Sequence, residues 1–224
     1  MLSRRRLLGG LLAAGTAGCA SSGPNSTLNL FSRTITSHSP AADEYPLSAE
    51  RIQEIPYATL GVRVDDQTRA VMVLANLDGR VLQWVSADRV IFETEGGRLL
   101  RTRGLKRDLV DTRWRTEAPD PFVAFSGDEA LPGRGVYREV DIGEERAVAV
   151  ESRFQVRGTE TITILGQQHT VRRVDEHAID RSWRWETRNS FWIDPQTGRV
   201  WRSFQQYCPE IPPIELELLK PAAV

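Results

Sequence analysis

The sequence of 224 residues is poor in cysteine, in long hydrophobic runs and in excess charge of either sign. Its two cysteines, Cys19 and Cys208, are too few for a disulfide framework. It has no run of about 18 or more uncharged apolar residues, so we expect no membrane-spanning helix. The 29 basic and 30 acidic side chains nearly balance. Because nucleic-acid-binding domains usually carry a basic excess, we expect no nucleic-acid partner.

Motifs of the common enzyme classes are also missing from the sequence. The segment AFSGD at 124–128 is nearest to the G-x-S-x-G motif of hydrolases but lacks its first glycine. No glycine-rich phosphate-binding motif occurs, and the three histidines (His38, His169 and His177) do not have the spacing of zinc ligands. We therefore predict no catalytic residue, no cofactor and no metal. A carboxylate pair of the glycosidase kind stays open, because its members are defined by their separation in space.

The first eighteen residues predict a secretory signal peptide. Three arginines at 4–6 precede a short apolar segment at 7–18, the order typical of such signals. The next residues, Thr-Ala-Gly-Cys at 16–19, resemble the lipobox of bacterial lipoproteins, in which the cysteine thiol receives a diacylglycerol. Thr16 stands where lipoboxes most often have leucine. The adjacent arginines leave both the general and the twin-arginine export routes open.

A lipidated Cys19 predicts a membrane anchor, since several acyl chains at one chain end detach very slowly. Ala20 occupies the place where aspartate would signal retention in the inner membrane. We therefore expect the periplasmic face of the outer membrane. Residues 19–46 are rich in small and polar side chains and predict a tether, although residues 25–37 could alternatively form a helix packed on the domain. Cys208 is then left without a partner and is predicted to be buried.

Residues 47–224 predict a single all-β, mainly antiparallel domain, either a half-barrel or a sandwich-like meander. Turn signals separate apolar runs at 78–79, 95–97 and 195–198. Residues 147–157 and 161–165 alternate apolar and polar side chains, which is typical of strands with one buried face. The inward positions expected from this alternation are Val148, Val150, Phe154, Val156, Ile162 and Ile164. Two short helices are also predicted, at 48–55 and 105–114.

Two groups of arginine and tryptophan residues are candidate binding residues. On one expected strand, Arg98 and Arg101 lie on opposite faces, and Arg103 shares the face of Arg101. The second group comprises Trp183, Trp185, Trp192 and Trp201, interleaved with arginines. Aromatic faces beside arginines suit sugar rings and anionic groups. Tryptophans that fill the core, with arginines extending over the sheet, are the favoured interpretation.

Six short segments in a fixed order carry a family resemblance. They are IPYATL (55–60), WVSAD (84–88), GRLLRTRGL (97–105), FWIDP (191–195), TGRVW (197–201) and LKP (219–221). Together they resemble the YjbF/GfcB-type group 4 capsule polysaccharide lipoprotein family over most of residues 45–221. The resemblance implies an outer-membrane lipoprotein encoded among capsule or exopolysaccharide genes, with an antiparallel β half-barrel or sandwich-like body. It implies no reaction, because the family offers no established catalytic residues to carry over.

The main hypothesis is a non-enzymatic accessory lipoprotein in capsular or exopolysaccharide assembly or export. Its expected partners are the membrane, through the N-terminal lipid, an outer-membrane export protein and the polysaccharide. Two alternatives stay open. One is a periplasmic enzyme that modifies polysaccharide with a carboxylate pair. The other is a carrier of lipid or lipoprotein whose barrel encloses an acyl chain.

The lipobox yields a direct prediction. Mass spectrometry of the native protein should find acyl chains on Cys19, and the protein should sediment with the outer membrane. Both properties should be lost in Cys19→Ala. A soluble wild-type protein without acyl chains would contradict the lipoprotein interpretation.

Overall fold

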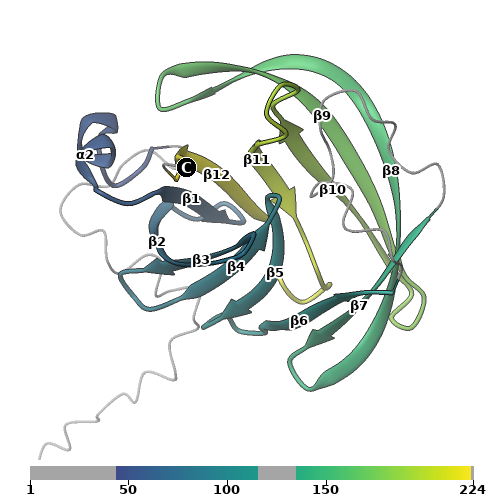
Figure 1. The fold of residues 1–224 in the computed structure, drawn as a ribbon. Coiled ribbons are helices and arrows are strands. Elements are labelled where there is room, and N and C mark those ends of the chain that lie inside the picture. Colours follow the sequence, from purple (N-terminus) through teal and green to yellow (C-terminus); the bar gives the residue numbers. More distant parts are fainter. Residues whose placement is uncertain (1–43, 116–134, 223–224) are drawn as a thin grey trace, which may run out of the picture.

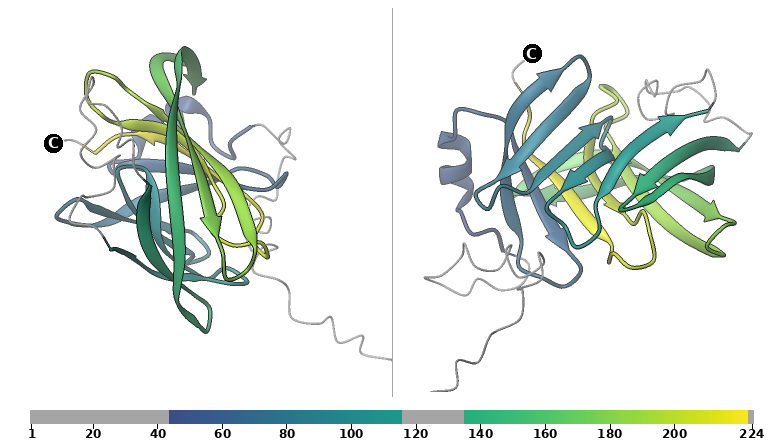
Figure 2. Two further views of the ribbon diagram at one scale, coloured as in Figure 1. Left: turned by 90° about the vertical axis from the view of Figure 1, so that its right-hand side faces the viewer. Right: turned by 90° about the horizontal axis from the view of Figure 1, so that it is seen from below.

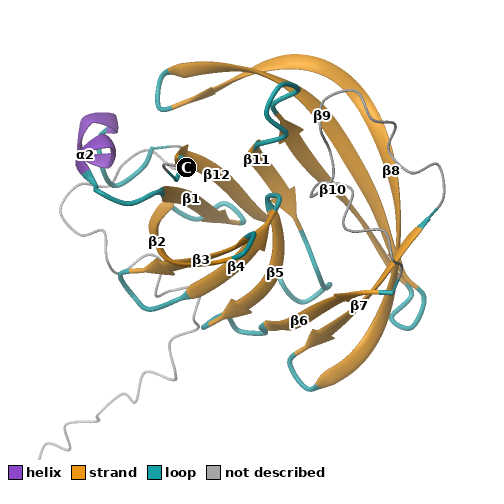
Figure 3. Ribbon diagram, viewed as in Figure 1, coloured by secondary structure: helices purple, strands orange, loops and turns teal. Residues whose placement is uncertain are grey.

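The computed structural model describes residues 44–115 and 135–222, in which one short helix precedes twelve strands (Figure 1). The helix, α2, spans Ala49–Glu54. The strands are Thr59–Val64 (β1), Ala70–Asp78 (β2), Val81–Ser86 (β3), Ile91–Glu95 (β4), Arg98–Arg103 (β5), Leu109–Trp114 (β6), Val136–Ile142 (β7), Glu145–Ile164 (β8), Gln167–Asp180 (β9), Trp185–Ile193 (β10), Val200–Gln205 (β11) and Ile214–Lys220 (β12). The all-β prediction is confirmed (Figure 3).

Several predictions fall outside the described residues. The signal peptide, Cys19, the segment at 25–37 and the motif at 124–128 all belong to this group. Tyr45, near the end of the predicted tether, is described, and its side chain lies against Gly61 of β1. In the part of the chain that the structure describes, no helix has the length and apolarity needed to cross a membrane.

All twelve strands form one antiparallel sheet in the order β5-β4-β3-β2-β1-β12-β11-β10-β9-β8-β7-β6. Strands that are consecutive in the chain pair with each other, except β5 and β6, and β1 also pairs with β12. The first and last strands therefore meet in the middle of the sheet. The two edge strands, β5 and β6, are consecutive in the chain and lie next to each other at the bottom of Figure 1. The sheet thus curls into a nearly closed barrel, extending the predicted half-barrel.

Side chains connect the two edge strands. The backbone N–H of Leu109 donates to the Thr102 hydroxyl at 2.9 Å, and the Thr112 hydroxyl donates to the carbonyl of Leu100 at 3.0 Å. Arg101 of β5 donates to the carboxylate of Asp111 at 2.7 Å. These contacts satisfy edge groups that would otherwise be open to pairing with another chain.

The predicted helix at 48–55 is confirmed as α2, and the Ser48 hydroxyl accepts the N–H of Arg51 at its start. The ammonium of Lys220 holds the other end by donating to the carbonyls of Gln53 and Ile55. This helix flanks β1 and β12, on the opposite side of the barrel from β7 (Figures 1 and 2).

The predicted helix at 105–114 is wrong, because residues 109–114 form strand β6. Leu109 is 2% exposed and the adjacent Val110 is 41% exposed, so successive side chains point to opposite faces.

The two strands expected at 147–157 and 161–165 are one long strand, β8, which pairs with β9. The pairing register shifts between Val156 and Gly158. Gly158 has a φ of 140°, a conformation that other residues rarely adopt. Val156, predicted to face inward, is 45% exposed at this irregularity.

Beyond this point the β8–β9 hairpin extends as an arm toward α2 (Figure 1). Ile162 and Ile164 are buried as predicted, but they pack in a second core with Ile52 of α2 and Leu219 of β12. The main core is a larger cluster of buried side chains that includes Leu60, Met72, Trp84, Phe92, Ile142, Val150 and Leu216.

Phe191 of β10 is fully buried beside Val174 and Ile193, whereas Phe204 of β11 is 39% exposed. We expect Phe191→Ala to lower the free energy of unfolding by about 3–5 kcal/mol, because it removes buried surface and leaves a cavity. Urea denaturation measures this loss. Phe204→Ala is the matched control and should cost clearly less, and equal costs would contradict the packing described.

Candidate functional site

An open pocket of about 440 Å³ lies at one end of the barrel. Its rim is formed by the turns β2–β3, β4–β5 and β10–β11 and by the segment after β12, which contribute Gly79, Gly96, Thr197 and Pro221. Because these turns border one pocket, the barrel interior is accessible between them. A pocket of this size lies within the usual range for small-ligand sites, roughly 300–1,000 Å³.

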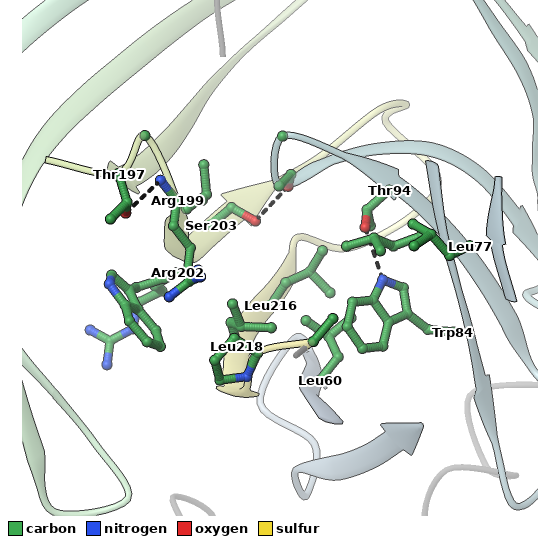
Figure 4. A pocket seen from close by; sticks show the side chains of 18 of the residues that line it. Leu60, Leu77, Trp84, Thr94, Thr197, Arg199, Arg202, Ser203, Leu216 and Leu218 are labelled. Carbon is green, nitrogen blue, oxygen red and sulfur yellow. Dashed lines mark hydrogen bonds between the residues drawn. The ribbon is translucent and has the colours of Figure 1, made fainter. Parts of the chain in front are cut away.

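One wall of the pocket is apolar. Leu60, Leu216 and Leu218 come from the central strands β1 and β12, and Trp84 comes from β3 (Figure 4). The indole N–H of Trp84 donates to the Thr94 hydroxyl at 2.9 Å, which satisfies the one polar atom of this side chain. The wall therefore offers apolar surface without an unpaired indole N–H.

The opposite wall is more polar and comes from β11 and the turn before it. Arg199, which follows this turn, lines the pocket on the same side (Figure 4). The Arg199 guanidinium lies over the Trp201 ring, 5.4 Å from its centroid. Arg202, also on this wall, forms an ion pair with Glu217 at 2.5 Å.

A second feature is a buried group of charges within the barrel. Glu176 of β9 is fully buried and accepts hydrogen bonds from Arg98 of β5 at 2.9 Å and Arg138 of β7 at 2.6 Å. The Asn189 amide of β10 donates to the same carboxylate at 2.9 Å. We call Arg98, Arg138 and Glu176 the buried triad. It connects β5, at one edge of the sheet, with β7 and β9, which lie near the other edge and are separated from each other by β8 alone.

The electrostatics of the buried triad favour the charged state. Burial alone would raise the pKa of Glu176, but the charges of Arg138 and Arg98 hold the pKa well below its ordinary value. The Arg98 guanidinium also lies over the rings of Phe191 and Trp114, at 5.0 Å and 5.5 Å from their centroids. Glu176 is thus an anion at neutral pH and is suited to binding arginines rather than to donating a proton.

Backbone groups of β5 are held from across the barrel by β11. The Gln205 amide donates to the carbonyl of Gly97 at 2.8 Å, and the amide oxygen accepts the N–H of Leu99 at 3.1 Å. The Ser203 hydroxyl donates to the same carbonyl at 3.2 Å. A side chain at Gly97 would collide with Val200, since a Cβ there would lie 2.5 Å from the valine. Glycine therefore permits this close approach.

The predicted arginine candidates occupy two environments. Arg98 is buried in the triad, whereas Arg101 and Arg103 are exposed on the other face of β5, as the alternation predicted. Arg101 forms ion pairs with Glu93 at 2.9 Å and with Asp111 at 2.7 Å. The structure does not bring these three arginines together into one site.

The four predicted tryptophans also divide. Trp183 packs against the main core beneath Arg107, and Trp185 borders a small internal cavity beside Arg98 and Arg138. Trp192 and Trp201 pack together with the second core, and Arg173 and Arg202 lie over the Trp192 ring. Trp201 also borders the open pocket.

The other residues considered from the sequence have structural contacts. His169 stacks on Trp201 at 3.9 Å, and burial lowers its pKa. His177 lies 3.0 Å from the carboxylate of Glu186. Among the described residues no three potential metal ligands cluster. Cys208 is buried, as predicted, and burial raises the pKa of its thiol to about 11.

Sequence analysis missed Glu176 and Arg138. A signal was present. Glu176 is two residues from Val174 and from Ala178, so it lies on the same face of its strand as these apolar residues, and Arg138 has the same relation to Val136 and Val140. Charged residues at the inward positions of apolar strands indicate a buried ion pair. The pocket carried no such signal, since its walls come from strands that are distant in the chain.

Comparison with known proteins connects this barrel to a family. The model of the group 4 capsule polysaccharide lipoprotein family, described by the names GfcB and YjbF, matches residues 27–219. The chain belongs to this family. The predicted resemblance is thereby confirmed.

Two relatives of this family from Escherichia coli K12 are similar along most of their length. The uncharacterized lipoprotein GfcB is 26% identical over 218 residues, which cover 97% of this chain and 99% of the relative. The uncharacterized lipoprotein YjbF is 26% identical over 179 residues, covering 79% and 81%. The crystal structure of the hypothetical lipoprotein YmcC from the same organism superposes with a TM-score of 0.69 at 25% identity, covering 90% of this chain and 99% of that one.

The buried triad predicts how stability depends on pH. Since the pKa of Glu176 is lower in the folded state, its stabilising contribution is complete above the unfolded pKa of about 4.3 and is lost as the pH falls toward the folded value. We expect Glu176→Gln to lower the free energy of unfolding by about 3–5 kcal/mol at neutral pH, because two buried arginines lose their counter-charge. On acidification Glu176→Gln should lose less stability than the wild type, because it lacks the carboxylate whose protonation destabilises the wild-type protein.

Chemical denaturation between neutral pH and about pH 3 measures both effects. Glu186→Gln, on the exposed side of β10, is the matched control and should change stability by about 0.5 kcal/mol or less. Equal stability of Glu176→Gln and the wild type would contradict the role assigned to the triad.

Proposed function

We propose that the protein is a lipid-anchored accessory of capsular or exopolysaccharide assembly or export, held by Cys19 on the periplasmic face of the outer membrane. In this proposal the barrel binds other molecules and catalyses no reaction. Its partners are an outer-membrane export protein and the polysaccharide. Membership in a capsule polysaccharide lipoprotein family and the lipobox at 16–19 support the proposal.

The observation that carries the proposal is the state of the acidic side chains. Arg98 and Arg138 hold Glu176, and Arg157 and Arg173 contact Asp175. For Asp175, too, burial opposes ionisation, yet its arginine and serine partners hold the pKa below the ordinary value. A glycosidase-type acid requires the opposite, a pKa raised toward neutrality. Acids held in this way support a structural role over an enzyme with a carboxylate pair.

Two further acids, Asp141 and Glu151, follow the same pattern. Arg113 lowers the pKa of Asp141 to about 2. Arg153 and Arg181 lower the pKa of Glu151. The second alternative, a carrier of lipid, gains support from a different observation, the open apolar pocket. A barrel that binds a lipid is compatible with an accessory role, so the two proposals do not compete.

The proposal predicts the phenotype of a clean deletion. The amount of surface polysaccharide should fall, while the sugar composition and substituents of the remaining polymer should stay unchanged. An accessory affects the amount exported, whereas a modifying enzyme affects the structure of the polymer. Unchanged polysaccharide would contradict the accessory role, and an altered structure at normal amount would favour the enzyme.

Complementation tests the anchor within the same strain. The wild-type chain should restore the polysaccharide and Cys19→Ala should not, although the variant protein accumulates. Cys208→Ala is the matched control, because it removes the other cysteine, which is buried in the barrel and has a poorly ionised thiol.

A further inference from the structure

The open pocket is bordered by apolar side chains of the barrel, of which Leu60, Trp84 and Leu216 are only 5%, 1% and 3% exposed. Leu60 and Leu216 belong to the main core, yet they border a space of about 440 Å³ that opens between the turns. Leu77 at the rim is 57% exposed. Apolar surface that is concave and accessible is unfavourable in water and is characteristic of a ligand site.

The rim supplies the guanidinium of Arg199. Arg199 makes no ion pair with another residue of the described ranges, and its side chain is only partly exposed. The guanidinium is held over the Trp201 ring, which limits its freedom. A preoriented guanidinium binds carboxylate or phosphate oxygens well, because it donates two parallel hydrogen bonds.

The other arginine on this wall is engaged differently. Arg202 donates to the Glu217 carboxylate at 2.6 Å, and Glu217 also accepts from Arg69 at 2.7 Å. The positive charge of Arg202 is therefore compensated by Glu217. The pocket thus combines an apolar wall, access from solvent and a guanidinium at the rim that forms no ion pair within the described residues.

We propose that this pocket binds an anionic amphiphile, with its aliphatic chain against Leu60, Trp84, Leu216 and Leu218 and its carboxylate or phosphate on Arg199. This inference deepens the proposed function by naming the ligand class of the barrel, and it rests on the barrel being a binding module. Uncharged aliphatic molecules share only the apolar contacts. Free anions share only the contact with Arg199.

Direct binding measurements test the proposal. The full chain carrying Cys19→Ala, which has no lipid of its own, is titrated with palmitate, hexadecyl phosphate and hexadecanol in a calorimeter. We expect saturable binding of one molecule per chain, tighter for the anions than for the alcohol. The tighter of the two anions identifies the headgroup chemistry. No saturable binding of either anion would overturn the proposal.

Two variants with matched controls locate the ligand. Arg199→Gln should weaken binding of the anions about tenfold, consistent with the loss of a charge-assisted contact, and leave hexadecanol unchanged. Arg103→Gln, an exposed arginine on the outer face of β5, should change none of them. Equal losses for anions and alcohol, or no loss in Arg199→Gln, would overturn the assignment of Arg199.

Leu218→Trp tests the apolar wall, since the larger indole has the open space of the pocket to occupy. It should weaken binding of all three probes at least tenfold, while Leu47→Trp, at an exposed site before α2, should not. Thermal unfolding verifies that both variants are folded. Undiminished binding in folded Leu218→Trp would overturn the site.

The two proposals fail separately. Absent binding in vitro together with lost polysaccharide in the deletion strain would overturn the ligand and leave the accessory role. Binding in vitro with unchanged polysaccharide in the deletion strain would overturn the accessory role and leave the pocket as a lipid site.

Discussion

Glu176 is the residue on which the closed form of the barrel depends. It is fully buried, and its carboxylate binds Arg138 of β7, two places away in the sheet, and Arg98 of β5, which the order of the sheet places far from β9. A buried ion pair gains little over apolar packing, but removing one partner leaves a charge without compensation. The arrangement in which all three residues meet is therefore strongly favoured over an open sheet. Other contacts of the barrel act within this constraint.

The topology explains why closure requires side chains. Backbone pairing joins β1 to β12, so the first and last strands form the centre of the sheet, and β5 and β6 are left as its edges. Those edges are joined by Thr102, Thr112 and the Arg101–Asp111 pair, while Gln205 holds β5 from across the interior. Between the turns at one end, the apolar wall of β1 and β12 stays accessible and forms the pocket.

Much of the fold could be predicted from the sequence, because local patterns encode it. Turn signals at 78–79 and 195–198 and alternation at 147–157 identified hairpins, and Ser48 identified the helix. The segment at 105–114 was misassigned because its apolar residues are too few to distinguish a period of two from a helical one. The paired strands β1 and β12 are separated by most of the chain, so no local pattern revealed the pocket between their side chains and Trp84. The triad is an intermediate case, since the inward positions of Glu176 and Arg138 could be read from the sequence, but their meeting with Arg98 could not.

Amide hydrogen exchange tests most directly whether the buried triad closes the barrel. Comparing Glu176→Gln with the wild type at neutral pH, the account predicts that the amides of Leu99 and Leu109, which bind side chains at the β5 edge, lose protection. The amides paired between β9 and β10 should keep theirs, because their partners are backbone groups of the continuous sheet. Unchanged protection at Leu99 and Leu109, or an equal loss across all strands, would contradict the central role of Glu176.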